Sequence, residues 1–344
     1  MVTRSRVTIR DVAARAGVSR QTISRVVNGS ERVSTATAER VRAAILELGY
    51  QPNAIARFMA RGHTETLVCL APNLTDYTFA SVIDGAEAAV RARGYYLMSS
   101  SAPDPATFAS LVGELIGGGH AEGLLVINPF VDERYTHLPA DVPVVLIGVC
   151  APGNPASSVS LDDPTAGRMA MAHLLSLGHR RIATITGPLA ENCAQERLGA
   201  YREMMAAHGA AVADNWVVEG NWSADAGYRA LEEILAGATP PTAIFAQNDQ
   251  MAVGVLRAAR ERQIAVPEQL SVIGIDDIPL ATHFEPPLTT VHQDFAAIGR
   301  TAAQLLTQAL ADPLAPPEHV RLAARLMVRN STAAVEMSQG IRVG

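Results

Sequence analysis

Residues 8–28 read TIRDVAARAGVSRQTISRVVN, and this stretch decides the fold of the N-terminal part of the chain. Thr8 and Asp11 have the three-residue spacing of a capping box at the start of a helix, and apolar residues follow at helical spacing. Gly17 predicts the end of that helix, because a left-handed residue is favourable there only for glycine. Ser19 is a suitable N-cap for a second helix, which also has one apolar face. Two helices joined by a short glycine turn predict a helix-turn-helix unit.

The outer face of the second helix is polar and basic, which suits contact with DNA. Arg20 and Gln21 stand at its start, where side chains of this motif reach base edges, and Arg25 lies on the same face one turn further on. Short hydroxyl and amide side chains suit phosphate oxygens, and the candidates are Thr8, Ser19, Thr22, Ser24 and Asn28. The alternative is a small helical bundle with a solvated polar face.

A third helix and a short helix-prone segment follow. The third helix is predicted from its cap Ser34 to Gly49, and the short segment covers residues 54–61. A helix of that length is only marginally stable alone in water. We therefore expect residues 54–61 to become helical only against a partner chain or in a DNA groove.

The 344-residue chain has a formal net charge of −6, but its charge is unevenly distributed. Residues 1–62 contain eleven arginines and four acidic residues, a balance of +7, whereas the remaining residues carry −13. A basic head on an acidic body indicates an anionic partner for the head alone. A solvated charged face would give the same count, so the motifs decide between the two.

The overall composition excludes several classes of protein. Hydrophobic residues make up 48% and charged residues 18%, which suffices for packed cores and excludes intrinsic disorder. No apolar run approaches the roughly 20 residues of a membrane span, and the N-terminus lacks the apolar stretch of a signal peptide. Cys69, Cys150 and Cys193 are too far apart for a disulfide framework or a cysteine-based zinc site. We expect a cytoplasmic protein without cofactor or metal.

From Thr66 onward, short apolar runs alternate with amphipathic segments of helical length. The runs predict strands at 66–71, 95–98, 123–127, 142–149, 158–161, 181–186, 243–245, 270–274 and 289–291. Helices are predicted at 79–93, 164–177, 193–208, 223–236 and 249–262. This alternation is typical of parallel α/β sheets. Some 280 residues are many for one such sheet, so we expect two lobes with a ligand cleft at the carboxyl ends of the strands.

Planar polar side chains stand near predicted strand ends, at Arg197, Asn248 and Asp276. Each can bridge two neighbouring hydroxyl groups, and Trp222 offers a ring that can cover the C–H side of a pyranose. Individually these residues have ordinary explanations, because Asn248 or Asp276 can cap a helix and Trp222 can pack in a core. Together on one cleft they favour a saccharide site.

Enzyme motifs are absent from the sequence, which has no P-loop, no GxGxxG after a strand, no GxSxG elbow and no HExxH. The nine histidines are scattered without the spacing of a common zinc site. We therefore expect no enzymatic activity. Two other classes of protein fit the sequence less well. A free sugar-binding transport protein is opposed by the basic head, and a metabolic enzyme with a regulatory head would need a catalytic constellation.

Several motifs of the head resemble the lactose-repressor (LacI/GalR) family of transcription regulators. They are DVAxxAGVS at 11–19, TISRVVN at 22–28, VS at 33–34, GYxPN at 49–53 and AR at 56–57. The resemblance runs without a gap from Val7 to Gly62 and implies a DNA-binding domain at 1–50 and a hinge helix at 51–62. In that family, paired hinge helices open the minor groove with an apolar residue, usually leucine, where this chain has Met59. The resemblance also implies DNA contacts from Ser34, Tyr50, Asn53 and Ala56.

The rest of the chain, residues 63–344, resembles the effector-binding and dimerisation core of the same family. The matching motifs are LGHRRI at 177–182, PTAIFAQNDQMAVG at 241–254, SVIGxDD at 271–277 and PLTTVxQDF at 287–295. That core looks like a periplasmic sugar-binding protein, with two lobes joined by three crossovers, here near Asp163, Gln293 and Arg321. The implied lobe 1 covers residues 63–163 and 293–321, and the implied lobe 2 covers residues 164–292 and 322–344.

The resemblance also assigns residues to the effector site. Arg197, Asn248 and Asp276 match the family's sugar-hydroxyl ligands. Trp222 matches a sugar-stacking tryptophan, and Asp163 matches an acidic residue between the lobes. The remaining candidates are Tyr77, Phe79, Cys193 and Gln293.

The first-lobe loop at 72–79 departs from the lactose repressor, because Tyr77 and Phe79 are aromatic where that protein has smaller apolar residues. Cys193 likewise stands in place of a serine. Aromatic residues in this loop also resemble relatives that bind purines. A nucleobase held between Phe79 and Trp222 is therefore the alternative effector.

Only fourteen residues follow Asn330, and they keep no sustained heptad. We therefore expect no tetramer-forming tail like that of the lactose repressor, and we expect a homodimer. The complete prediction is a transcriptional repressor that reads a pseudo-palindromic operator. A small saccharide bound between the lobes, such as a galactoside-like pyranose, would control its operator affinity.

Overall fold

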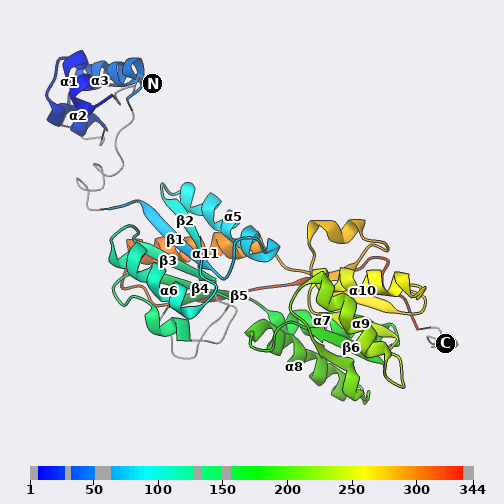
Figure 1. The fold of residues 1–344 in the computed structure, drawn as a ribbon. Helices are drawn as coiled ribbons and strands as arrows, with labels where there is room; N and C mark the ends of the chain where they lie inside the picture. The colour runs from blue at the N-terminus through cyan, green and yellow to red at the C-terminus, as the bar shows by residue number, and fades with distance from the viewer. Residues whose placement is uncertain (1–6, 28–31, 51–62, 128–132, 149–155, 336–344) are drawn as a thin grey trace. The chain divides into compact units, whose positions relative to one another are not determined.

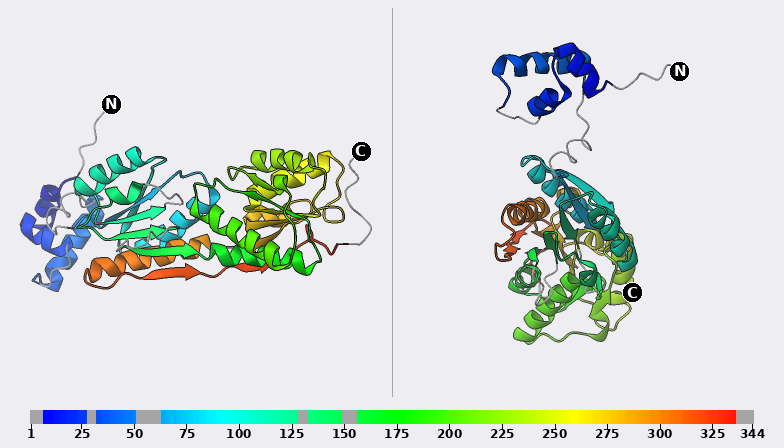
Figure 2. Two further views of the ribbon diagram at one scale, coloured as in Figure 1. Left: turned by 90° about the horizontal axis from the view of Figure 1, so that it is seen from below. Right: turned by 90° about the vertical axis from the view of Figure 1, so that its left-hand side faces the viewer.

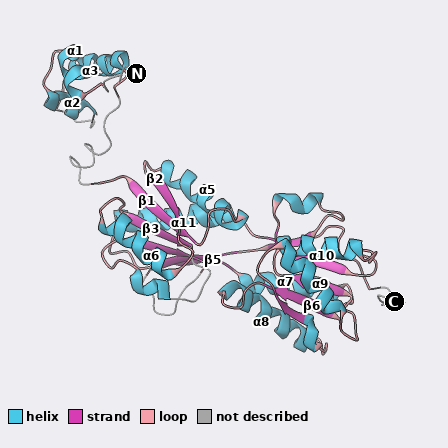
Figure 3. Ribbon diagram, in the orientation of Figure 1, coloured by secondary structure: helices cyan, strands magenta, loops and turns pink. Residues whose placement is uncertain are grey.

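A computed structural model gives the fold and describes residues 7–27, 32–50, 63–127, 133–148 and 156–335. The chain forms two compact units, residues 1–65 and residues 66–344, which are described separately. Figure 1 labels their elements, and Figure 3 separates helices from strands. Within the described residues, no helix is both long and apolar enough to cross a membrane.

The N-terminal unit is all-helical, as predicted, and consists of α1 (Ile9–Ala16), α2 (Arg20–Val27) and α3 (Thr35–Leu48). Val12, Ile23 and Val41, one from each helix, are fully buried at its centre. This packing confirms the helix-turn-helix unit. The predicted hinge helix at 51–62 lies outside the described residues.

The helix ends of this unit are set by local residues. The Asp11 carboxylate accepts hydrogen bonds from the N–H and the hydroxyl of Thr8, both at 2.7 Å. Gly17 and Gly49 end α1 and α3 in the left-handed conformation, with φ of 65° and 61°. Glycine adopts this conformation without the steric penalty of a Cβ.

The C-terminal unit contains two six-stranded sheets, one in each lobe. The lobe 1 sheet is parallel throughout, in the order β11-β5-β4-β3-β1-β2. Its strands are β1 (Thr66–Ala71), β2 (Tyr96–Ser101), β3 (Gly123–Ile127), β4 (Val144–Ile147), β5 (Ser157–Leu161) and β11 (His319–Leu322). This architecture confirms the predicted two-lobed α/β core.

The lobe 2 sheet has the order β12-β10-β9-β8-β6-β7 and is parallel except for the antiparallel pair β10·β12. Its strands are β6 (Ile182–Thr186), β7 (Val217–Glu219), β8 (Ala243–Ala246), β9 (Ser271–Asp276), β10 (Thr289–His292) and β12 (Arg325–Met327). The chain passes between the two sheets three times, after β5, after β10 and between β11 and β12. Figure 2 shows the last of these passages as the red segment near the C-terminus.

Helices cover both faces of each sheet (Figure 2). In lobe 1, one face packs against α5 (Tyr77–Arg91) and α11 (Phe295–Ala311), and the other against α6 (Pro105–Val112), which a π-helical turn at Gly113–Gly117 extends. In lobe 2, α7 (Asp163–Ser176) and α8 (Asn192–Ala207) cover one face, and α9 (Ala224–Leu235) and α10 (Asp249–Glu261) cover the other. Three short 3-10 helices lie between these elements, at Glu133–His137, Asp214–Trp216 and Pro279–His283.

Hydrophobic periodicity did not predict three of the observed strands, β7, β11 and β12. All three lie at sheet edges, and their residues are mostly exposed or half-buried. Edge strands have only one hydrogen-bonded neighbour and are often short and charged. They therefore lack the continuous apolar run that marks the buried parallel strands.

A buried histidine ties the C-terminal segment to lobe 2. His179 is 3% exposed, and its Nε2 lies 3.0 Å from the carbonyl oxygen of Ala333, while Nδ1 lies 2.9 Å from the hydroxyl of Thr242. Burial lowers the pKa of His179 from 6.5 to about 4. The folded state therefore contains the neutral ring at neutral pH.

Because His179 is buried in its neutral form, we expect the free energy of unfolding to decrease in mild acid. As pH falls from 6.5 towards 4, the unfolded chain binds a proton that the folded chain does not, so folding is opposed by up to about 3 kcal/mol. Urea unfolding at a series of pH values should show a smaller decline for His179→Gln than for the unmodified protein over this range. His208→Gln, at an exposed histidine of the same lobe, is the control and should leave the decline unchanged. Equal declines for the unmodified protein and His179→Gln would contradict the assignment.

Candidate functional site

A cavity of about 280 Å³ lies in the C-terminal unit and is lined from both lobes. Pockets for small ligands in proteins have volumes of roughly 300–1,000 Å³, so this cavity suits a ligand of one or two rings. Its polar or charged lining residues are Asn73, Asp76, Thr78, Ser160, Asp163, Glu191, Arg197, Asn221, Asn248, Gln250 and Asp276. Its apolar lining includes Phe79, Ile127, Ile147, Leu161, Trp222, Phe295 and Ile298.

Seven of the nine predicted effector residues line this cavity, namely Phe79, Asp163, Cys193, Arg197, Trp222, Asn248 and Asp276. The other two lie outside its lining. Tyr77 is 38% exposed and makes an edge-on contact with Phe295, with ring centroids 6.4 Å apart. Gln293 is buried beneath the cavity, where its Oε1 accepts a hydrogen bond from Arg197.

Arg197 is held rigidly inside the core. Its Nε and Nη2 lie 2.7 and 2.6 Å from the same carboxylate oxygen of Asp163. Nη1 donates to the carbonyl oxygen of Gln247, and Nη2 donates to Gln293 at 3.3 Å. Burial lowers the pKa of Arg197, but the surrounding acidic groups, of which Asp163 contributes most, together outweigh this effect and raise the pKa above its ordinary value. Most of its N–H donors are thus already used within the protein.

Trp222 is fixed by three contacts from different elements. Its indole N–H donates to Glu191 at 2.9 Å, and its carbonyl oxygen accepts a hydrogen bond from the Asn248 side chain at 3.0 Å. The Arg197 guanidinium carbon lies 5.7 Å from the ring centroid, within the range of a cation–π contact. The backbone of Trp222 has a φ of 68°, a left-handed conformation that is uncommon for a non-glycine residue.

The ring of Trp222 also requires a glycine beside it. A Cβ added to Gly187, directly after β6, would lie 1.9 Å from the ring, a separation that atoms do not tolerate. The tryptophan therefore occupies the space that a side chain at the end of β6 would fill. This arrangement makes the ring a preformed surface on which a flat or apolar ligand face can stack.

Asn248 and Asp276 differ in whether their side chains are already hydrogen-bonded within the protein. Asn248 caps α10, because its Oδ1 accepts from Met251 N–H at 2.8 Å while its amide holds Trp222. The helix-cap explanation therefore describes Asn248 at least in part. Asp276, at the end of β9 with a φ of 123°, is 5% exposed, and its carboxylate has no hydrogen-bond partner among the described residues. Burial raises the pKa of Asp276 well above its usual value.

Glu191 is a cavity residue that the sequence analysis did not select. It precedes α8 but does not cap it with its side chain. Instead, Oε2 accepts the Trp222 N–H, and the Cys193 sulfur lies 3.9 Å from the same oxygen. Burial raises the pKa of Glu191 to about 7, and burial likewise raises the pKa of the Cys193 thiol.

Asp76 and Asn73, in the loop after β1, also line the cavity and were not selected. The reasoning used for the second lobe could have found them, since both follow a buried strand at its carboxyl end. Glu191 follows β6 in the same way.

The predicted DNA-contacting residues of the helix-turn-helix unit differ in their exposure and in whether their side chains already have a role at a helix end. Arg20, Gln21 and Arg25 are exposed on α2. Three of the predicted DNA-contacting residues already have roles at helix ends: the Thr8 hydroxyl donates to Asp11, Ser19 Oγ accepts from Thr22 N–H at 3.1 Å, and Ser34 caps α3. Thr22, Ser24 and Tyr50 are half-buried. Asn28, Asn53, Ala56 and Met59 lie outside the described residues.

Within the part of the chain that the structure describes, no group of three or more His, Cys, Asp or Glu residues is arranged to hold a metal ion. The site thus consists of fixed hydrogen-bonding groups and aromatic surfaces. A helix-turn-helix unit followed by a two-lobed core with a polar cavity defines a class of protein, the DNA-binding regulators that carry a ligand-binding core.

Comparison with known proteins identifies the family. Residues 8–53 match the bacterial regulatory proteins of the lacI family, and residues 171–332 match the periplasmic binding protein-like domain. The HTH-type transcriptional regulator CelR of Thermobifida fusca is 36% identical over 340 residues, covering 96% of this chain and 100% of CelR. The HTH-type transcriptional repressor PurR of Escherichia fergusonii is 35% identical over 333 residues, covering 95% of this chain and 97% of PurR.

Solved structures agree with this assignment. The lac repressor dimer bound to operator and the anti-inducer ONPF superposes with a TM-score of 0.87 at 30% identity, covering 96% of this chain and 100% of that chain. The complex of the transcriptional regulator CelR with cellobiose gives a TM-score of 0.72 at 35% identity, covering 95% and 100%. The chain belongs to the lacI family of bacterial regulatory proteins, a family of DNA-binding transcriptional regulators.

Proposed function

We propose that the protein is a dimeric repressor whose affinity for a pseudo-palindromic operator is controlled by a saccharide in the cavity between the lobes. The observation that carries the saccharide is the fixed ring of Trp222 beside the unpartnered carboxylate of Asp276 in one cavity. A tryptophan face suits the C–H side of a pyranose, and a carboxylate accepts bonds from two of its hydroxyls. The solved complex of the related CelR with cellobiose supports this choice.

The cavity offers both hydrogen-bond acceptors and donors to a ligand. Asp76, Glu191 and Asp276 contribute carboxyl groups, and the amides of Asn73, Asn221 and Gln250 contribute N–H donors. Sugar hydroxyls both donate and accept hydrogen bonds, so they match such a mixed lining. A sugar phosphate would place an anion among carboxylates, so this lining disfavours it.

A purine is the second candidate effector. Phe79 and Trp222 both line the cavity, and two aromatic side chains can hold a flat base between them. When ionised, the carboxyl groups of Asp76, Glu191 and Asp276 accept hydrogen bonds but donate none, so a hydroxyl-rich saccharide matches more of the lining than a purine does.

The proposed control acts through the two lobes. Both lobes contribute lining residues, so a ligand that contacts both binds one lobe arrangement more tightly than another. That difference in affinity is what couples the cavity to DNA binding. Arg20 and Gln21 would read base edges from α2, one α2 helix in each half-site.

Both halves of this proposal can be tested in one experiment. The full-length protein is expected to select a two-fold symmetric sequence from a random duplex library, and Arg20→Ala to lose at least tenfold in affinity for it, because a base contact is worth about 1–3 kcal/mol. A panel of neutral hexoses, pentoses, amino sugars, disaccharides, sugar phosphates and purines is then titrated against the complex. Release or strengthening by one saccharide class supports the proposal. A response to purines alone would overturn the saccharide assignment, and the absence of any selected sequence would overturn the operator assignment.

A further inference from the structure

The charges that line the cavity are unbalanced. Four carboxyl groups line it, and the one cationic side chain among the described lining residues is Arg197. Arg197 is already paired with Asp163 at 2.6 Å. The other three carboxyl groups, of Asp76, Glu191 and Asp276, form no ion pair of their own among the described residues, and the Arg197 guanidinium acts on Glu191 and Asp276 only from a distance.

Two of these carboxyl groups come from opposite lobes. Asp76 precedes α5 of lobe 1, where its Oδ1 accepts from Thr78 N–H at 2.8 Å, and Oδ2 has no recorded partner in the described part of the chain. Glu191 precedes α8 of lobe 2, where Oε2 accepts from Trp222 and Oε1 has no recorded partner among those residues. Burial is the main cause that raises the pKa of Glu191, and the charge of Asp76 adds to it. Both carboxyl groups line the same cavity, one from each lobe.

We propose that the saccharide effector is an amino sugar, with its ammonium group held between Asp76 of lobe 1 and Glu191 of lobe 2. This inference rests on the proposed function and specifies its ligand. An ammonium group has three N–H donors, which match the unpartnered oxygens Oδ2 and Oε1 and leave one for a ring oxygen, a water molecule or Asp276. Bonds between ionised partners are about twice as strong as neutral ones.

The same arrangement explains how the ligand would act on the lobes. Closing the cavity brings two carboxylates of opposite lobes towards each other, and their repulsion opposes closure. A cation between them replaces repulsion by attraction on both sides. It therefore binds the closed arrangement more tightly than the open one, which is the requirement for a ligand-driven shift.

A metal ion is the other cation that carboxylates commonly bind. A divalent ion needs several oxygen ligands at one point, and no group of three or more His, Cys, Asp or Glu in the described residues meets that requirement. An ammonium group needs only single acceptors at separate positions. The geometry therefore favours the amine.

Calorimetric titration of the full-length protein at pH 7.5 tests the inference with matched ligands. Glucosamine is compared with glucose and N-acetylglucosamine, galactosamine with galactose and N-acetylgalactosamine, and the glucosamine disaccharide with cellobiose. At least one amine is expected to bind ten times more tightly than its neutral and N-acetylated counterparts. Calcium chloride alone is expected to produce no binding.

Two isosteric variants locate the charge. Glu191→Gln keeps an acceptor for the Trp222 N–H, and Asp76→Asn keeps an acceptor for the end of α5, so both preserve the local structure while removing one charge. Each should reduce the preference for the amine over its neutral counterpart at least tenfold, because only the amine has a positive charge that loses its partner. Glu196→Gln is the matched control on α8, because Glu196 is exposed and does not line the cavity.

The outcomes separate this inference from the proposed function. Neutral sugars that bind as tightly as amines, with a ratio unaffected by Glu191→Gln, would overturn the amino sugar and leave the saccharide regulator standing. Calcium binding that Glu191→Gln abolishes would overturn the amine in favour of a metal. If no saccharide of either kind binds, the proposed effector class is itself wrong.

Discussion

Arg197→Leu is expected to lower the free energy of unfolding by about 3–5 kcal/mol, the usual loss when one partner of a buried ion pair is removed. Asp163 is 7% exposed, so its carboxylate would remain buried without its guanidinium. The carbonyl of Gln247 and the Oε1 of Gln293 would lose donors as well. Chemical denaturation of the C-terminal unit within the full-length protein measures the loss.

Arg168→Leu on α7 is the control for this experiment. Arg168 pairs with Glu203 at 3.3 Å, and the side chains are 41% and 60% exposed. Exposed ion pairs contribute about 0–1 kcal/mol, so the control should stay within that range. The double variant Asp163→Leu/Arg197→Leu should recover part of the loss, because neither charge is then left alone. A loss for Arg197→Leu no larger than that of the control would show that the pair does not hold the core together.

Gly254→Ala is expected to destabilise lobe 2 by roughly 3 kcal/mol, at the upper end of the range for overpacking. A Cβ on Gly254 of α10 would lie 1.8 Å from the carbonyl oxygen of Ala224 at the start of α9. Gly227 of α9 makes the reciprocal approach, since its Cβ would lie 2.0 Å from the carbonyl oxygen of Met251. The two helices meet backbone to backbone, so a methyl group can be accommodated only by moving a helix.

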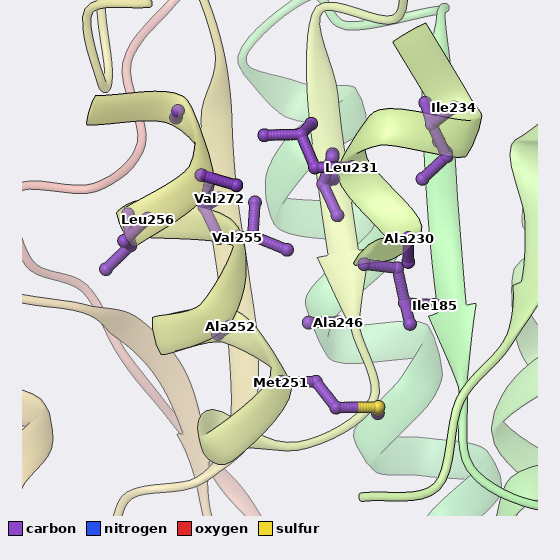
Figure 4. Close-up of a cluster of buried hydrophobic side chains, with 14 of the residues drawn as sticks. Ile185, Ala230, Leu231, Ile234, Ala246, Met251, Ala252, Val255, Leu256 and Val272 are labelled. Carbon is purple, nitrogen blue, oxygen red and sulfur yellow. The ribbon is translucent and has the colours of Figure 1, made fainter. Parts of the chain in front are cut away.

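That movement would open the apolar cluster beneath the helices. Figure 4 shows Leu231 of α9 and Val255 of α10 in this cluster, facing the strands of lobe 2. Gly199→Ala on α8 is the matched control, because a Cβ there meets no atom within 4 Å. Alanine is a better helix former than glycine, so the control should gain roughly 0.5–1 kcal/mol. Similar effects of the two substitutions on the unfolding midpoint would contradict the close-packing account.

The packing of α9 against α10 at Gly254 also affects the position of Trp222 in the cavity. The helix that carries it begins after Asn248, whose side chain holds the backbone of Trp222. The position of the stacking ring therefore depends on how closely α9 and α10 approach. In the same way, Gly187 has no side chain because the ring occupies that space.

The sequence by itself determined the helix-turn-helix unit and the alternation of strands and helices in the core. Helix ends depend on residues three or four positions apart, such as Thr8 with Asp11, so local reading places them correctly. Buried parallel strands show as continuous apolar runs, so the sequence also marked the β1 and β3 segments within their observed bounds. The resemblance to the lactose-repressor family then marked seven of the residues that line the cavity.

Only the tertiary structure decided which polar groups the protein keeps for itself. The Asn248 amide holds the backbone of Trp222, Gln293 supports Arg197 instead of lining the cavity, and Glu191 accepts the Trp222 N–H from a different element. Short edge strands such as β11 likewise depend on a neighbour far along the chain. These features are set by contacts between residues tens to hundreds of positions apart, and a pattern read along the sequence contains only the spacing of near neighbours.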